Sequence, residues 1–99
     1  MSVPVEYLPE AEDDIDWTYR WYEHQRTGLG EDFVLKLRMS IDTISNNPKM
    51  YGIYRRKIRT APVKRFPYFV YYVDRGDDVL VIAVAHGRRS QRAWRGRRF

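Results

Sequence analysis

The sequence predicts a small α+β domain, a two-layer sandwich in which a helical hairpin covers one face of an antiparallel sheet. Between residues 9 and 46, apolar residues recur every three or four positions, which is the period of a helix. After residue 50 the chain alternates or runs apolar in short stretches, as strands do. Because 99 residues support only one hydrophobic core, we expect a single domain over residues 1–99.

The chain opens with a short strand and a first helix. Residues 3–8 alternate, and Pro4 restricts this strand to a sheet edge or a strand start. From Pro9 to about Gln25 the period becomes helical, and acidic residues crowd the first turns, where the helix dipole favours negative charge. The stripe on one helical face consists of Ala11, Ile15, Thr18, Tyr19 and Tyr22, with Trp17 and Trp21 beside it. The two tryptophans are expected either in the hairpin core or on a surface that faces a partner.

A second helix follows after a short link. The glycines of residues 27–30 can end one helix, and Thr27 can cap the next. The apolar positions of the second helix are Leu29, Phe33, Leu37, Ile41 and Ile44, and Asn46-Asn47-Pro48 stops it. So short a link makes the two helices an antiparallel hairpin.

Three strands complete the expected fold as an antiparallel meander, giving the order β-α-α-β-β-β. Residues 53–60 form a strand whose polar face is entirely basic, residues 63–73 a central aromatic strand, and residues 79–86 an almost wholly apolar strand. A turn at 75–78 makes the last two a hairpin. The aromatic residues 66–72 are expected in the core rather than as a platform for stacking bases.

Charge is distributed unevenly along the chain. Residues 1–50 carry 5 basic and 10 acidic side chains, and residues 51–99 carry 13 basic and 3 acidic ones, for a net charge of +5 overall. Nothing in the expected fold covers the sheet face opposite the helices. We therefore expect a bare, arginine-rich sheet face that meets an anionic partner.

Several classes of protein are excluded on composition. The chain has no cysteine, no apolar run near the roughly 20 residues that a membrane span needs, and no pattern of a signal peptide, so a cytoplasmic protein is expected. His24 and His86 are the only imidazoles and lie far apart in sequence, so neither a metal site nor a cofactor is expected.

The sequence resembles the RelE/ParE superfamily of toxins from type II toxin–antitoxin systems, and within it the ParE-like branch. The resemblance covers nearly the whole chain. It rests on residues 11–22, 29–33, 47–48, 58–59, 65–72 and 84–89, with Trp94 and Arg97 behind. Ser90-Gln91 stands where family members usually carry a proline, which affects the local turn only. The resemblance implies a growth-inhibiting toxin neutralised by a cognate antitoxin, acting either on DNA gyrase or, as RelE-like members do, on messenger RNA in the ribosome.

The nuclease alternative needs a proton carrier and cations around a phosphate. His86 is the candidate acid or base because its reference pKa lies near neutrality, and arginines match phosphate geometry. The candidate phosphate clamp consists of Arg59, Arg65 and Arg88. The opposing interpretation is that His86 is bonded to a backbone carbonyl and that the arginines are a solvated sheet face.

Gyrase inhibition needs only a complementary surface, and we favour it over mRNA cleavage. The candidate target-binding residues are Arg55, Lys57, Arg89, Arg92, Trp94, Arg95 and Arg97, since Arg and Trp are favoured interface anchors. Alternatively, Trp94 folds back onto the sheet as core. The antitoxin is expected to lay an acidic or amphipathic segment along the basic sheet face and the helical hairpin. A third hypothesis is a nucleic-acid-binding module that neither cuts nor poisons.

Overall fold

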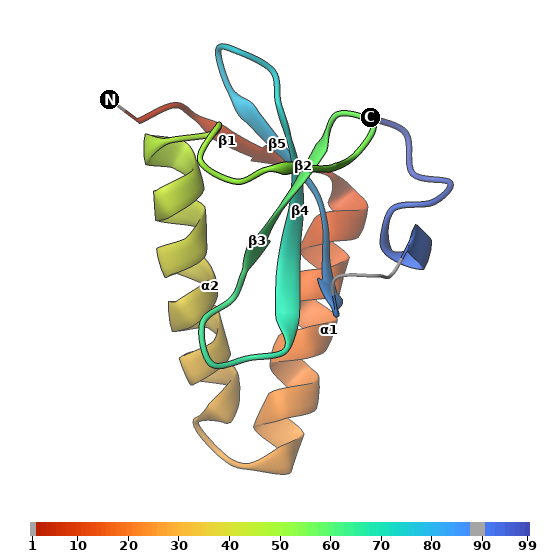
Figure 1. The fold of residues 1–99 in the computed structure, drawn as a ribbon. Coiled ribbons are helices and arrows are strands. Elements are labelled where there is room, and N and C mark those ends of the chain that lie inside the picture. The colour runs from red at the N-terminus through yellow and green to blue at the C-terminus, as the bar shows by residue number, and fades with distance from the viewer. Residues whose placement is uncertain (1, 88–90) are drawn as a thin grey trace.

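A computed structural model describes residues 2–87 and 91–99 as a helical hairpin packed on a five-stranded sheet (Figure 1). The α+β class and the two-layer arrangement expected from the sequence are confirmed. The elements in chain order are β1 (Val5–Tyr7), α1 (Pro9–Gln25), α2 (Leu29–Asn46), β2 (Ile53–Arg55), β3 (Ile58–Pro62), β4 (Tyr68–Asp74), β5 (Val79–His86) and a short 3-10 helix, η1 (Gln91–Ala93).

The sheet has the strand order β1-β5-β4-β3-β2. Strand β1 pairs in parallel with the start of β5, from Val79 to Val81, and the other neighbours are antiparallel. The first and last strands of the chain therefore lie side by side. Among the described residues, no helix is both long and apolar enough to span a membrane.

Two strand predictions need correction. Residues 53–60 form not one strand but two, β2 and β3, because Arg56 adopts a left-handed conformation, with φ of 54°, and turns the chain back. Strand β4 begins at Tyr68 rather than at residue 63, because residues 63–67 form a turn. That turn closes with the amide of Val63 donating to the carbonyl of Tyr68, and Arg65 has a φ of 69°.

The helical hairpin is held by a close contact at its link. Glu23 of α1 accepts hydrogen bonds from the amides of Gly28 and Gly30, both at 3.0 Å, and so supplies partners for the open N-terminus of α2. A side chain at Gly30 would bring a Cβ within 2.6 Å of the carbonyl oxygen of Tyr19. Glycine at this position lets the two helices approach.

The core between the helices and the sheet is aromatic. The rings of Tyr22 and Phe33 on the helices meet those of Phe66 and Tyr68 at centroid distances of 5.0 to 6.0 Å, mostly edge to face. Tyr72 is fully buried on the same side. These aromatic side chains are core, as expected from the sequence.

The opposite face of the sheet is also covered, so the expectation of a bare face is wrong. Tyr71 and Ile82 are fully buried there, and the C-terminal tail folds back over them with Trp94 at 7% exposure. A bulge in β5 opposite Tyr71 adds to this cluster, since both Ile82 and Ala83 belong to it. The face is too apolar to remain in water, and the nearest chain available to cover it is the tail.

Candidate functional site

The C-terminal tail is fixed to the sheet by an aromatic contact and an ion pair. Trp94 packs among the buried residues of the second face, with the ring of Phe99 at 6.5 Å and the guanidinium of Arg56 at 5.8 Å from its ring centroid. Trp94 is therefore a core residue, which was the alternative to the target-binding role expected from the sequence. Its indole holds the tail against the turn between β2 and β3.

Arg97 ties the tail to the first helix. Its two terminal nitrogens donate to the carboxylate of Asp14 at 2.7 and 2.9 Å, and one of them also donates to the carbonyl of Ile82 at 2.8 Å. The same carboxylate accepts the amide of Val84 at 3.0 Å. These hydrogen bonds to the Asp14 carboxylate raise the pKa of the Arg97 guanidinium. Arg97 is thus engaged within the fold rather than placed on an open surface.

The remaining basic residues of the tail and of the β2–β3 turn are exposed. Because Arg56 lies over Trp94, these two segments meet at one place on the molecule. We call this set the cationic rim, and it consists of Arg55, Arg56, Lys57, Arg92, Arg95 and Arg98. Four of the expected target-binding residues belong to it, while Arg89 lies outside the described residues. The arrangement provides several exposed cations around a buried aromatic anchor, which suits binding to an anionic surface.

The structure does not gather the candidate nuclease residues. His86 is exposed at the end of β5, with its ring 5.4 Å from that of Tyr68, and Arg65 lies in the turn at the same end of the sheet. Arg59 pairs in register with Tyr72, four residues further along β4, which places it roughly 13 Å away along the strand direction. There it donates to the carbonyl of Tyr51 at 2.6 Å. Arg88 lies outside the described residues.

His86 also lacks an orienting partner in the part of the chain that the structure describes, since no hydrogen bond there joins it to a carboxylate. In the same residues no cluster of three or more histidine, aspartate and glutamate side chains could hold a metal ion. General acid–base chemistry at His86 would therefore depend on groups supplied from elsewhere.

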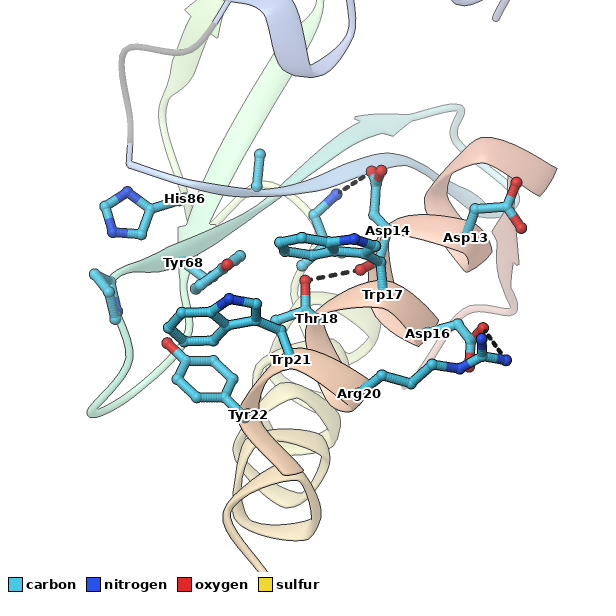
Figure 2. A pocket seen from close by; sticks show the side chains of 13 residues that line it. Asp13, Asp14, Asp16, Trp17, Thr18, Arg20, Trp21, Tyr22, Tyr68 and His86 are labelled. Atoms are coloured by element: carbon cyan, nitrogen blue, oxygen red, sulfur yellow. Dashed lines mark hydrogen bonds and ion pairs between the residues drawn. The ribbon is translucent and has the colours of Figure 1, made fainter. Parts of the chain in front are cut away.

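A pocket of about 1000 Å³ lies between α1 and the end of β5 (Figure 2). Trp17 and Trp21, one helical turn apart on α1, face it with 61% and 45% of their surfaces exposed, so they are surface residues rather than hairpin core. His86 and Tyr68 border it from the strands, and Asp13 borders it from α1. The sequence hinted at the exposure of both tryptophans, because they lie beside the buried stripe of the helix rather than in it. Nothing in the sequence indicated that they would lie next to the end of β5.

Comparison with known proteins agrees with the fold described above. The family model described as "ParE toxin of type II toxin-antitoxin system, parDE" matches residues 5–91. A solved structure described as the chromosomal ParDE TA system from P. aeruginosa superposes with a TM-score of 0.76 at 13% sequence identity, covering 88% of this chain and 98% of that one. No curated protein matches the sequence significantly. Because the family model spans most of the residues, the chain belongs to the ParE toxin family of type II toxin–antitoxin systems.

Proposed function

We propose that this protein is a growth-inhibiting toxin that poisons DNA gyrase and that a cognate antitoxin neutralises it. It acts in the cytoplasm, where gyrase works, and it needs no cofactor. Membership of the ParE family supports the toxin assignment, and the resemblance to ParE-like members motivates gyrase as the target.

The observation that carries the choice of target is the cationic rim. Trp94 and Arg97 hold the tail rigidly while the neighbouring arginines stay exposed, so the rim is a fixed array of charges that needs no catalytic group. Gyrase at work holds DNA, and a cationic surface complements both phosphates and acidic protein patches. In this proposal Trp94 and Arg97 act by positioning the tail.

The separation of His86 from Arg59 supports the same choice. Metal-free RNA cleavage needs the proton carrier and the phosphate clamp around one reacting phosphate, within hydrogen-bond distance. His86 pairs with Tyr68, the first residue of β4, whereas Arg59 pairs with Tyr72, four residues further along that strand. Ribosome-dependent cleavage of mRNA is therefore the less favoured mechanism.

The test is a supercoiling assay with purified gyrase, relaxed plasmid and ATP. We expect the protein to inhibit supercoiling and to accumulate linear, protein-linked plasmid. His86→Ala should inhibit as well as the unaltered chain. A parallel assay for mRNA cleavage in a translating extract should show no cut products, and cleavage that His86→Ala abolishes would replace gyrase with the ribosome as target.

The antitoxin is tested separately, by co-expressing the protein encoded beside this chain. Restored growth and a stable complex are expected. If the toxin binds duplex DNA tightly without gyrase, inhibits nothing and is not neutralised, it is a nucleic-acid-binding module, and the toxin assignment fails.

A further inference from the structure

We propose that the edge of β5 beside Trp17 and Trp21 receives an extended segment of the antitoxin as an additional strand. This inference rests on the proposed function, because it names the antitoxin as the partner. The sequence predicted an antitoxin segment along a basic sheet face and the helical hairpin. The surface proposed here includes α1 of that hairpin, but it is aromatic and bordered by acidic residues rather than basic.

The first observation is an unfinished sheet edge. Strand β1 covers β5 only from Val79 to Val81, and residues 82–86 pair with β4 alone among the described strands. Side chains replace a strand partner at two points on this edge: Asp14 accepts the amide of Val84, and Arg97 donates to the carbonyl of Ile82. These two bonds show that the amide of Val84 and the carbonyl of Ile82 point away from β4.

The direction of the next main-chain groups follows from the strand geometry. Main-chain N–H and C=O groups point to alternate sides of a strand from one residue to the next. Because the amide of Val84 points away from β4, the carbonyl of Val84 and the amide of His86 point to the same outer edge. The amide of Gly87 points the other way, toward the carbonyl of Pro67 at 2.8 Å. A strand laid along this edge would find one acceptor and one donor ready.

The second observation is the aromatic floor beside that edge. Trp17 and Trp21 present two large exposed indoles, and together with Tyr68 and Ala85 they line the pocket next to the strand end (Figure 2). Strand addition draws affinity from the main chain and specificity from pockets that hold alternate side chains. The pocket therefore selects an extended segment with apolar side chains at alternate positions.

The third observation is charge. Asp14 is neutralised by Arg97, and Asp16 pairs with Arg20 at 3.0 Å. Asp13 lines the same pocket, and in residues 2–87 and 91–99 no ion pair compensates it. The strand should therefore carry a lysine or arginine where it passes Asp13.

The experiment measures binding of the co-encoded antitoxin to purified variants by calorimetry. His86→Pro removes the outward amide while leaving the hydrogen bonds to β4, and His86→Ala keeps that amide. We expect the Kd to rise at least tenfold for His86→Pro relative to His86→Ala, because both variants lack the imidazole and only the first lacks the amide. Trp21→Ala should raise the Kd at least tenfold relative to the unaltered chain. Leu35→Ala, an exposed apolar residue of α2 outside the pocket, is the matched control and should stay within twofold.

Hydrogen exchange of the unaltered chain gives a second measurement that does not depend on variant folding. The amide of His86 should exchange at least tenfold more slowly in the complex. If Trp21→Ala weakens binding but His86→Pro equals His86→Ala and the amide stays unprotected, the pocket holds a helix and strand addition is wrong. If no pocket variant changes the Kd, the site lies elsewhere, although neutralisation itself would still stand.

Discussion

A single carboxylate joins three parts of the molecule. Asp14 sits in α1, accepts the amide of Val84 in β5, and receives both terminal nitrogens of Arg97 in the tail. In the sequence it looks like Asp13 and Asp16, two more acids in the first turns of a helix. Its partners are 70 and 83 residues away, so no local pattern could distinguish it.

Asp14→Asn should lower the free energy of unfolding by roughly 2–3 kcal/mol, because it leaves the largely buried Arg97 guanidinium without a counter-charge. Urea denaturation measures this change. The matched control is Asp16→Asn, whose ion pair with Arg20 is exposed and should contribute less than about 0.5 kcal/mol. Equal effects of the two substitutions would contradict a structural role for Asp14.

Tyr72 makes stability depend on alkaline pH. Burial raises the pKa of its phenol from the usual 10.0 to about 12, and the phenol donates to the carbonyl of Pro48 at 2.8 Å. Between these values the unfolded chain loses a proton that the folded chain keeps. The free energy of unfolding should therefore be undiminished by this group below pH 10 and fall as the pH rises from 10 to 12.

The measurement is urea denaturation at several pH values between 9 and 11.5. Tyr72→Phe removes the group and should flatten the fall, although it lowers stability at every pH through the lost hydrogen bond. An unchanged slope in Tyr72→Phe would show that another tyrosine is responsible.

At the scale of elements, the long helices could be predicted from the sequence and the short strands could be predicted only in part. The helices, at 17 and 18 residues, carry stripes long enough to fix both their type and their ends. The strands after residue 50 are short, and the alternation of residues 53–60 continues through the turn at Arg56, whose left-handed backbone leaves no trace in a basic run. The number of strands therefore could not be read from pattern alone.

Gly30→Ala tests the contact that holds the helical hairpin. A Cβ at this position would lie 2.6 Å from the backbone oxygen of Tyr19, so the helices must move apart, and we expect a loss of roughly 1–3 kcal/mol. Gly52→Ala is the matched control because a Cβ there meets nothing within 4 Å. Thermal unfolding should show a lower Tm for Gly30→Ala only. A Tm as high as that of Gly52→Ala would mean that the hairpin tolerates a wider separation.

At the scale of the whole molecule, the tail decides which surface is open. The charge asymmetry of the sequence predicted a cationic surface built from the second half of the chain, and every residue of the cationic rim lies in that half. It could not show that Trp94 and Arg97 cover the second sheet face, because their partners lie on strands and on α1, far away in the sequence. In place of the expected bare face, the exposed basic residues form the cationic rim around the buried Trp94.

Under the proposed gyrase mechanism, removing three rim charges with Arg92→Gln, Arg95→Gln and Arg98→Gln together should raise the concentration for half-inhibition of gyrase roughly tenfold. The control removes as many charges from the helical side with Lys36→Gln, Arg38→Gln and Lys49→Gln. Supercoiling assays at two salt concentrations provide the measurement, and the difference between the two variants should shrink at high salt. Equal loss in both variants would indicate that net charge alone matters.

The side-by-side placement of β1 and β5, together with the link from Asp14 to Arg97, has a consequence for biosynthesis. Both contacts join residues from the first sixteen of the chain to residues from the last twenty-one. While residues 79–97 are still inside the ribosomal tunnel, neither the pairing of β1 with β5 nor the contact of Asp14 with Arg97 can form. The fold therefore becomes complete only after these residues have left the tunnel, when the antitoxin can already be present.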